Sequence, residues 1–323
     1  MPVPPGCGWS AGTDAKPLTR SIGTHWKEEP GPTAARCSRS GRMSRPPLGV
    51  ESPKPDRVGG GHHPDPVAVL NLPGEEGPRR PSSELAHRLG LPLCGPSEAN
   101  PEHLLLVASA QGLELWAGSE RRAGYARVDW SIRSEVRGAG RRLAGQPLPR
   151  AIGRKPGFVV DATAGFGGDA FALATLGHRV LAVERSPVMA ALLEDGRARA
   201  LADPQLQEAA GRIQICCADA RERLGQLDPP PDAVYIDPMY PAPPRAKAAL
   251  PRIEIQLLRR LVGTNSTDTE LLAAALASGA RRVVVKRPPG APVLPGPRVD
   301  SHSGKLVRYD VYHAAPSNPP GVT

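Results

Sequence analysis

The chain has 323 residues, of which 39 are proline, 35 are glycine and only 12 are aromatic, and its formal net charge is +9. Its hydrophobic pattern excludes a coiled coil, its irregular glycine spacing excludes a collagen, and it lacks the roughly 18 consecutive apolar residues of a membrane-spanning helix. Five cysteines without a C-x-x-C motif indicate neither a disulfide framework nor a metal site. We therefore expect a cytoplasmic protein that holds no metal.

Residues 1–64 are predicted to be a disordered tail. They are rich in proline, glycine, serine and arginine, and such a composition buries too little apolar surface to offset the entropy lost on folding. Residues 1–100 contain 17 prolines, whereas residues 157–228 contain two, so a regular fold is expected in the second window. Met43 opens the segment MSRPPLGVE and is an alternative start of translation.

Residues 65–156 are predicted to form a small α+β unit followed by an arginine-rich connector. Residues 66–72 have the pattern of a strand, residues 82–91 that of a short helix capped by serine, and residues 103–117 that of two strands around a Gln-Gly turn. Residues 121–155 hold nine arginines and one lysine against two acidic residues, a net charge of +8. Because arginine suits phosphate, this charge favours a nucleic-acid partner, with a solubilising surface as the alternative.

Residues 157–315 are predicted to alternate between strands and helices. The expected strands are 158–162, 178–184, 212–218, 232–238, 281–287 and 306–314. The expected helices are 169–177, 186–201, 252–262 and 267–280, of which the second has Ser186 as its cap and Pro187 as its first residue. This alternation is typical of an α/β fold with a doubly wound, mostly parallel sheet. Residues 316–323 are expected to be a flexible tail.

A glycine-rich loop follows the first of these strands. The strand ends at Asp161 and leads into Gly165, Gly167 and Gly168. Glycine lets a cofactor approach the backbone closely, and the N-terminus of the next helix offers N–H groups. Glu184 ends the second strand, 19 residues after Gly165, where a carboxylate can hold both hydroxyls of a ribose. Because this spacing also fits a dinucleotide fingerprint, a nicotinamide-dependent oxidoreductase is an alternative.

The segment Asp237-Pro238-Met239-Tyr240-Pro241 directly follows the fourth strand. In a doubly wound sheet this position faces the ligand crevice, and the segment resembles the D/N-P-P-Y/F loop of amino-group methyltransferases. Methylating an exocyclic amine needs an acceptor for its N–H and a ring to stack on the base. We assign the first role to Asp237 and the second to Tyr240, with S-adenosylmethionine as the methyl donor. A turn that merely closes the strand is the alternative.

Several motifs, taken in order, resemble the bacterial small-subunit ribosomal RNA guanine-N2 methyltransferase J family. They are the stretch 158–201, YIDPMYP at 235–241, RRVVVKRP at 281–288 and RYDVY at 308–312. The resemblance spans roughly residues 66–314, and the basic stretch 137–153 falls where that family has a basic, glycine-rich segment. It implies a class I methyltransferase fold and methyl transfer from S-adenosylmethionine to the N2 amine of one guanine in small-subunit ribosomal RNA.

The resemblance also implies the cofactor contacts. The matching positions are Gly168, Asp169, Glu184, Arg185, Asp219, Ala220 and Asp237. Gly168 stands where the family usually has arginine, and Asp219-Ala220 stand where it usually has two small hydroxyl residues. Asp219 is suited to bind an adenine amino group. Pro147 and Pro149 interrupt a stretch that is helical in relatives, which leaves its shape open.

Basic residues beside the expected crevice are assigned to phosphates of the RNA, which position a substrate without reading its sequence. These predicted contacts are Arg141, Arg142, Arg245, Lys247, Lys286 and Arg287. The expected partner is small-subunit ribosomal RNA or a 30S-type particle. Cys216 and Cys217 are expected to be buried strand residues, and Tyr309 and Tyr312 to serve packing. Two further alternatives are a non-enzymatic ribosome-assembly factor and an amino-methyltransferase acting on DNA adenine or a protein glutamine.

Overall fold

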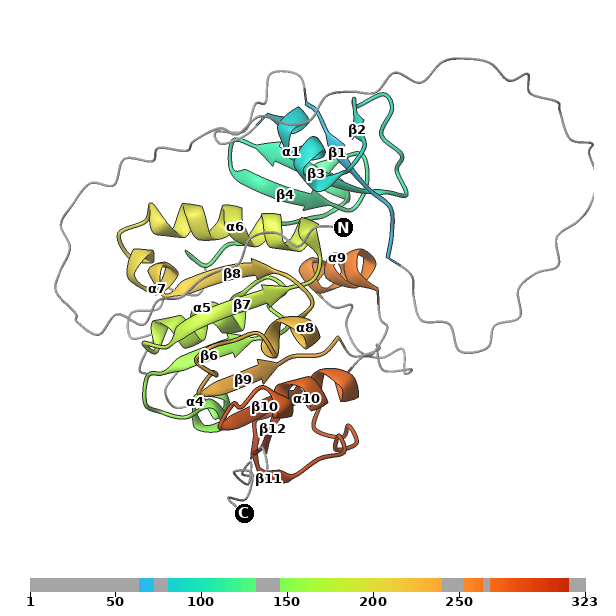
Figure 1. The fold of residues 1–323 in the computed structure, drawn as a ribbon. Coiled ribbons are helices and arrows are strands. Elements are labelled where there is room, and N and C mark those ends of the chain that lie inside the picture. The colour runs from blue at the N-terminus through green and yellow to red at the C-terminus, as the bar shows by residue number, and fades with distance from the viewer. Residues whose placement is uncertain (1–63, 73–80, 132–145, 240–251, 264–267, 314–323) are drawn as a thin grey trace, which may run out of the picture. The chain divides into compact units, whose positions relative to one another are not determined.

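The computed structural model describes residues 64–72, 81–131, 146–239, 252–263 and 268–313 (Figure 1). All of them belong to one compact unit, Gly61–Thr323. Apart from Pro64, the predicted tails at 1–64 and 316–323 lie outside the described residues. So do five of the predicted site residues, Arg141, Arg142, Tyr240, Arg245 and Lys247.

The first sheet has the strand order β2-β1-β3-β4-β5. Its strands are β1 (Val67–Leu70), β2 (Leu93–Cys94), β3 (Leu104–Ser109), β4 (Gly112–Trp116) and β5 (Tyr125–Ala126), with α1 (Ser82–Leu89) between β1 and β2 and a 3-10 turn, η1 (Arg121–Ala123), before β5. β1 is parallel to both β2 and β3, whereas β3 and β4 form the expected antiparallel hairpin. The predicted serine cap of α1 is wrong. Ser82 is the first helical residue and is buried, and Pro81 occupies the cap position without a side-chain hydrogen bond.

The second sheet has the strand order β11-β12-β10-β9-β6-β7-β8. Its strands are β6 (Phe158–Asp161), β7 (Arg179–Glu184), β8 (Ile213–Cys217), β9 (Ala233–Ile236), β10 (Arg282–Arg287), β11 (Arg298–Ser303) and β12 (Arg308–Tyr312). β6 to β10 are mutually parallel, and β12 and β11 add antiparallel strands at one edge. The doubly wound, mostly parallel sheet is therefore confirmed. The chain leaves β6 toward β7 on one side and returns on its other side with β9, which makes the β6–β9 junction the switch point of the sheet.

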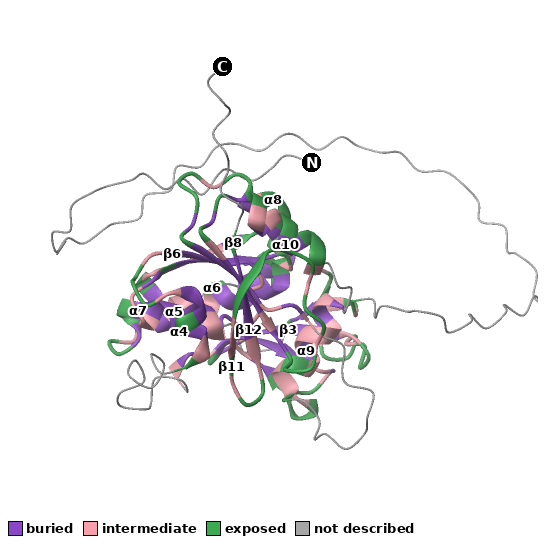
Figure 2. Ribbon diagram, turned by 90° about the horizontal axis from the view of Figure 1, so that it is seen from below, coloured by how far each residue is buried: buried purple, intermediate pink, exposed green. Residues whose placement is uncertain are grey.

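Helices cover both faces of the second sheet. Figure 2 shows α4 (Pro147–Ile152), α5 (Gly168–Thr175) and α7 (Gln207–Gly211) on one side, and α8 (Ala220–Leu224) and α10 (Asp268–Ala277) on the other. α6 (Pro187–Leu201) packs on β7 and β8, and α9 (Ile253–Val262) packs on β3 and β5 of the first sheet. Among the described residues, no helix is both long enough and apolar enough to cross a membrane.

Two helix starts show how local chemistry sets the boundaries. Ser186 caps α6 by accepting a hydrogen bond from the Met189 N–H at 3.3 Å, with Pro187 in the first turn, as the sequence predicts. Pro147 lies in the first turn of α4, where the missing N–H of proline removes no intrahelical hydrogen bond. The stretch with Pro147 and Pro149 is therefore helical.

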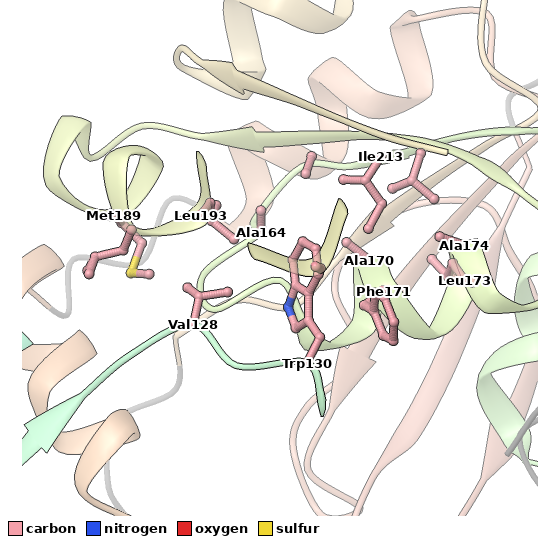
Figure 3. Packing of buried hydrophobic residues seen from close by; sticks show 14 of the residues in the cluster. Val128, Trp130, Ala164, Ala170, Phe171, Leu173, Ala174, Met189, Leu193 and Ile213 are labelled. Atoms are coloured by element: carbon pink, nitrogen blue, oxygen red, sulfur yellow. The ribbon is translucent and has the colours of Figure 1, made fainter. Parts of the chain in front are cut away.

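One hydrophobic core joins residues of the two sheets. It includes Leu104 and Leu115 of the first sheet, together with side chains of β6, α5 and α6. Trp130, which follows β5, is one of its buried side chains (Figure 3). The indole stacks on Phe171 of α5 with ring centroids 5.0 Å apart, and its Nε1–H donates to the Phe166 carbonyl at 3.2 Å. The segment after the first sheet thus packs beneath the glycine-rich loop.

α6 packs against β4 of the first sheet and against the segment that follows β5. Asp195 accepts a hydrogen bond from the Leu113 N–H at 3.1 Å, and Arg199 donates to the Val128 carbonyl at 2.5 Å. Gly196 lies between these two residues, and a Cβ at that position would come within 2.6 Å of the Val128 Cβ. Only a residue without a side chain allows the backbone of residue 128 to approach the helix this closely.

Candidate cofactor and substrate site

A pocket opens at the carboxyl ends of β6, β7, β8 and β9, around the switch point of the sheet. It encloses about 810 Å³, part of it open to solvent. Four segments form one wall of the pocket: the loop after β6, the end of β7, the start of α8 and the segment after β9. Side chains of α9 and α10 form the opposite wall. Six of the predicted cofactor residues line this pocket, namely Gly165, Glu184, Arg185, Asp219, Ala220 and Asp237.

The glycine-rich loop owes its glycines to both backbone shape and packing. Gly165 and Gly167 have φ angles of +51° and +70°, in the left-handed region that favours glycine. A Cβ at residue 167 would lie 2.8 Å from Leu193 Cδ2 and 2.9 Å from Trp130 Cζ2. Gly167 therefore lets the loop close over the core, whereas Gly165 lines the pocket itself.

Glu184 is fixed by the loop that it faces. Its Oε2 accepts the Gly165 N–H at 3.0 Å, and its Oε1 accepts the Ser186 N–H at 2.9 Å. The residue is 7% exposed, and burial raises the pKa of its carboxyl, although the two backbone hydrogen bonds oppose that shift. The structure therefore presents one oriented carboxylate at the end of β7 to the pocket.

Asp219 caps the start of α8, on the next segment of the wall. Its Oδ1 accepts the Arg221 N–H at 2.9 Å, and its Oδ2 pairs with the Arg221 guanidinium at 2.6 Å. The hydrogen bond from Arg221 lowers the pKa of Asp219, so the carboxyl stays ionised. Apolar side chains of α9 and α10, Leu258, Val262 and Leu271, complete this part of the pocket.

Asp237 is held at the pocket wall by one residue of the loop after β6 and one residue of β10. Its backbone N–H donates to Thr163 Oγ1 at 2.7 Å, and its Oδ2 accepts from Lys286 Nζ at 2.8 Å. The same lysine Nζ lies 3.0 Å from Oδ2 of Asp169, which also accepts the Tyr235 hydroxyl at 2.7 Å. A chain of polar groups thus runs from the pocket into the sheet.

Burial and the positive charge of Lys286 determine the pKa values of the carboxyls in this polar cluster. Burial raises the pKa of Asp237 to about 6, an effect that Lys286 opposes and Asp169 reinforces. Burial favours a neutral Lys286, but the two carboxylates outweigh it and raise the lysine pKa. Asp161 is 1% exposed, and its burial, reinforced by Asp169, raises its pKa well above the ordinary value. The buried end of the cluster therefore favours a neutral carboxyl, and the pocket end an ionised one.

Of the other predicted site residues that the structure describes, six do not line the pocket: Asp161, Gly167, Gly168, Asp169, Lys286 and Arg287. Asp161 and Asp169 instead belong to the polar cluster around Lys286 and Asp237. Arg287 is 6% exposed and donates to the Pro292 carbonyl at 2.6 Å and to Asp268 at 3.4 Å. Its burial conflicts with the prediction that it contacts RNA.

Lys286, also predicted as a phosphate contact, directs its ammonium group into the carboxylate cluster, where it pairs with Asp169 and Asp237. The structure also tests the predictions for the paired cysteines and for the two tyrosines of β12. Cys216 is buried but Cys217 is exposed, so the prediction of two buried cysteines is half wrong. Tyr309 and Tyr312 are buried, as a packing role requires.

Sequence reasoning missed several residues of the site. Thr163 and Tyr235 hold the polar cluster, and Leu258, Val262 and Leu271 form the apolar wall. Thr163 had a local signal, since it is a hydroxyl residue inside the glycine-rich loop. The residues of α9 and α10 had none, because the chain returns to the pocket only through tertiary packing.

The donor set of the pocket fits a nucleoside cofactor. Glu184 offers carboxylate oxygens for vicinal hydroxyls, and Asp219 offers an acceptor for an amino group. The apolar side chains of α9 and α10 suit the faces of a flat heterocycle. Within the described part of the chain, no group of three or more His, Cys, Asp or Glu residues is placed to hold a metal ion.

Comparisons with known proteins identify the family of this chain. A family model described as a putative SAM-dependent methyltransferase matches residues 84–314. The ribosomal RNA small subunit methyltransferase J of Thioalkalivibrio sulfidiphilus is 44% identical over 242 residues, which are 72% of this chain and 93% of that protein. The protein of the same name from Pseudomonas aeruginosa is 42% identical over 236 residues, which are 70% of this chain and 87% of that protein.

A solved structure extends the similarity to the fold. The SAM-dependent methyltransferase from Neisseria gonorrhoeae matches with a TM-score of 0.57 at 30% identity, covering 78% of this chain and 97% of that one. These matches favour S-adenosylmethionine as the cofactor over the nicotinamide alternative. The chain belongs to the family of S-adenosylmethionine-dependent methyltransferases that includes ribosomal RNA small subunit methyltransferase J.

Proposed function

We propose that this enzyme transfers the methyl group of S-adenosylmethionine to the exocyclic N2 amine of a guanine in small-subunit ribosomal RNA. The observation that carries the proposal is the placement of Asp237 at the wall of a nucleoside-type pocket, with its backbone bound to Thr163 and its carboxylate bound to Lys286. The names of the curated relatives support the choice of RNA.

The chemistry follows from the amine. Its lone pair is delocalised into the guanine ring, so the nitrogen attacks well only when an acceptor holds one N–H and turns the lone pair out of the ring plane. Asp237 is that acceptor. S-adenosylmethionine supplies a methyl group already activated for transfer. A bond forms from N2 to the methyl carbon while the electron pair of the C–S bond stays on sulfur. N2 then releases one proton, and Asp237 accepts it on the way to solvent.

Cofactor binding is assigned to other residues around the same pocket. Glu184 holds the ribose hydroxyls and Asp219 the adenine amino group, while Leu258 and Val262 contact the ring. Gly165 brings the loop backbone close to the cofactor. Asp161 and Asp169 lie outside the pocket lining and set the charge around Asp237.

RNA binding is assigned to basic residues outside the pocket. A stacked guanine cannot reach Asp237, so the base must be flipped out of its helix, and Tyr240 is assigned to stack on it. Arg141, Arg142, Arg245 and Lys247 are assigned to phosphates, whereas Lys286 and Arg287 are not, because their side chains are engaged inside the protein. A ribosomal RNA substrate makes the cytoplasm the proposed site of action.

The test is a methyl-transfer assay with 30S subunits from a bacterial strain that lacks the corresponding enzyme. Labelled S-adenosylmethionine is the donor, and mass analysis of the digested RNA identifies the product nucleoside. The wild-type enzyme should form N2-methylguanosine. Asp237→Asn should lower kcat by about 10²- to 10³-fold, the usual loss on removal of one transition-state partner, with little change in cofactor affinity.

Asp203→Asn is the matched control, because Asp203 lies outside the pocket lining and its side chain accepts a local hydrogen bond from the Gln205 N–H. It should methylate RNA at the wild-type rate. If Asp237→Asn retains full kcat, Asp237 is not the acceptor. If the labelled methyl group appears on a different atom or in protein or DNA alone, the substrate assignment is wrong.

A further inference from the structure

Lys286 is the residue that connects Asp237 to the interior of the sheet. It lies on β10, between the carboxylate of Asp237 after β9 and that of Asp169 on α5. The two N–O distances are 2.8 and 3.0 Å, and the lysine side chain is 22% exposed. A lysine whose ammonium is held between two carboxylates has lost most of its freedom to follow a mobile substrate.

The contact selects one oxygen of the Asp237 carboxylate. Lys286 Nζ binds Oδ2, while the backbone N–H of Asp237 is tied to Thr163. With main chain and Oδ2 both fixed, the plane of the carboxylate is fixed as well. The oxygen Oδ1 is then the one that we assign to the N–H of the amine.

We propose that Lys286 is a positioning residue for methyl transfer, which orients the Asp237 carboxylate and keeps it ionised while the guanine amine binds. The inference rests on the proposed function of Asp237. Lys286 itself touches neither substrate nor cofactor in this assignment. Asp169 is its anchor on the far side, and the Tyr235 hydroxyl in turn holds Asp169 at 2.7 Å.

The charge around Asp237 explains why such a residue is needed. Burial alone would favour the neutral carboxyl, and a neutral carboxyl is a poor acceptor for an amine N–H. Lys286 is the cation that opposes this effect. The titratable groups that face Asp237 from the surrounding elements are Asp161 on β6, Asp169 on α5, Tyr235 on β9, Lys286 on β10 and Tyr309 on β12.

The sign of the pH dependence can be worked out from these groups. Asp237 must be ionised, so kcat of the wild-type enzyme should rise as pH increases through about 6 and then level off. Removing the positive charge of Lys286 raises the pKa of Asp237 further, which moves the rising limb to higher pH. Removing the negative charge of Asp169 has the opposite effect, because Asp169 raises the pKa of Asp237.

The experiment compares single-turnover rates of Lys286→Met, Lys286→Arg and Asp169→Asn between pH 5 and pH 9, with 30S subunits and saturating S-adenosylmethionine. Loss of an opposite charge this close raises the pKa of a carboxyl by about 1–3. The rising part of the rate–pH curve of Lys286→Met should therefore move to higher pH by at least about one pH unit. Lys286→Arg should restore the wild-type limb, and the limb of Asp169→Asn should move down. Calorimetric binding of S-adenosylmethionine by each variant establishes that it is folded.

Other outcomes separate the possible failures. If Lys286→Met lowers the rate equally at every pH without moving the limb, Lys286 has a structural role and the inference is overturned, while the function of Asp237 stands. If Lys286→Met does not bind cofactor, the downward shift of Asp169→Asn decides, and an unmoved limb in that variant overturns the inference. If Asp237→Asn itself keeps the wild-type rate and limb, the proposed function of Asp237 fails first.

Discussion

Substitution of Gly196 by alanine tests whether α6 and the segment after β5 are packed as closely as the structure describes. Gly196 is buried within α6. Helix propensity alone predicts that alanine stabilises an interior helical position by about 1 kcal/mol relative to glycine. The new Cβ, however, would lie 2.6 Å from the Val128 Cβ and 3.1 Å from the Val128 carbonyl oxygen.

The packing effect should exceed the propensity effect. Valine is branched at Cβ and cannot turn away, so the backbone of residue 128 must move. Overpacking of this kind destabilises by about 1–3 kcal/mol. The same movement weakens the hydrogen bond from Arg199 to the Val128 carbonyl, and a bond from a charged donor contributes about 1.5–3 kcal/mol when intact. We therefore expect Gly196→Ala to lower the free energy of unfolding by about 1–3 kcal/mol.

Urea denaturation followed by circular dichroism measures this change, with Gly211→Ala as the matched control. Gly211 is also helical, at the end of α7, but a Cβ there would meet no atom within 4 Å. The control should be neutral or up to about 1 kcal/mol more stable. If Gly196→Ala is as stable as Gly211→Ala, the close approach of residue 128 to α6 is refuted.

Three further predictions concern the pocket and the buried cluster. Glu184→Gln should weaken S-adenosylmethionine binding about 10- to 100-fold in calorimetry, the equivalent of a charged hydrogen bond. Glu222→Gln, at an exposed position of α8 outside the pocket lining, should bind normally. Arg260→Ala removes hydrogen bonds of 2.6 and 3.0 Å that tie α9 to Asp65 and to the Ala117 carbonyl, so it should weaken cofactor binding without touching the pocket, and an unchanged Kd would contradict this coupling. The pKa of Asp161 is raised in the folded state, so above the ordinary carboxyl pKa the unfolded chain loses this proton while the folded chain keeps it. The wild type therefore loses stability as pH rises through that range. The Tm of Asp161→Asn relative to wild type should thus increase between pH 5 and pH 8, and a constant difference would count against that shift.

The order of the fold was predictable where strands are buried on both faces. β6, β7, β9 and β10 are short runs of apolar residues, and such runs indicate a parallel sheet. β11 carries no such signal, because Arg298–Ser303 is a largely exposed edge strand that exists only through pairing with β12. α7 and α8 have five residues each, too few to show a helical period.

The site was predictable as far as the carboxyl ends of the strands. Glu184, Asp219 and Asp237 lie around one pocket because parallel strands end at the same edge of the sheet. The sequence could not tell the environment of Lys286 from that of Arg287. Successive strand residues point to opposite faces of the sheet, and the sequence does not show which face carries the carboxylates. Lys286 faces the carboxylates, whereas Arg287 is buried against Asp268.

The stacking of Trp130 on Phe171 restricts how this enzyme can be divided or recombined. The indole belongs to the segment after the first sheet, yet it packs beneath the glycine-rich loop and touches the space that Gly167 leaves open. A shorter chain that begins at residue 157 would keep every residue of the pocket but lose the floor under its loop. The two sheets are therefore not exchangeable modules, and a chimera that replaces the first sheet must also reproduce the tryptophan.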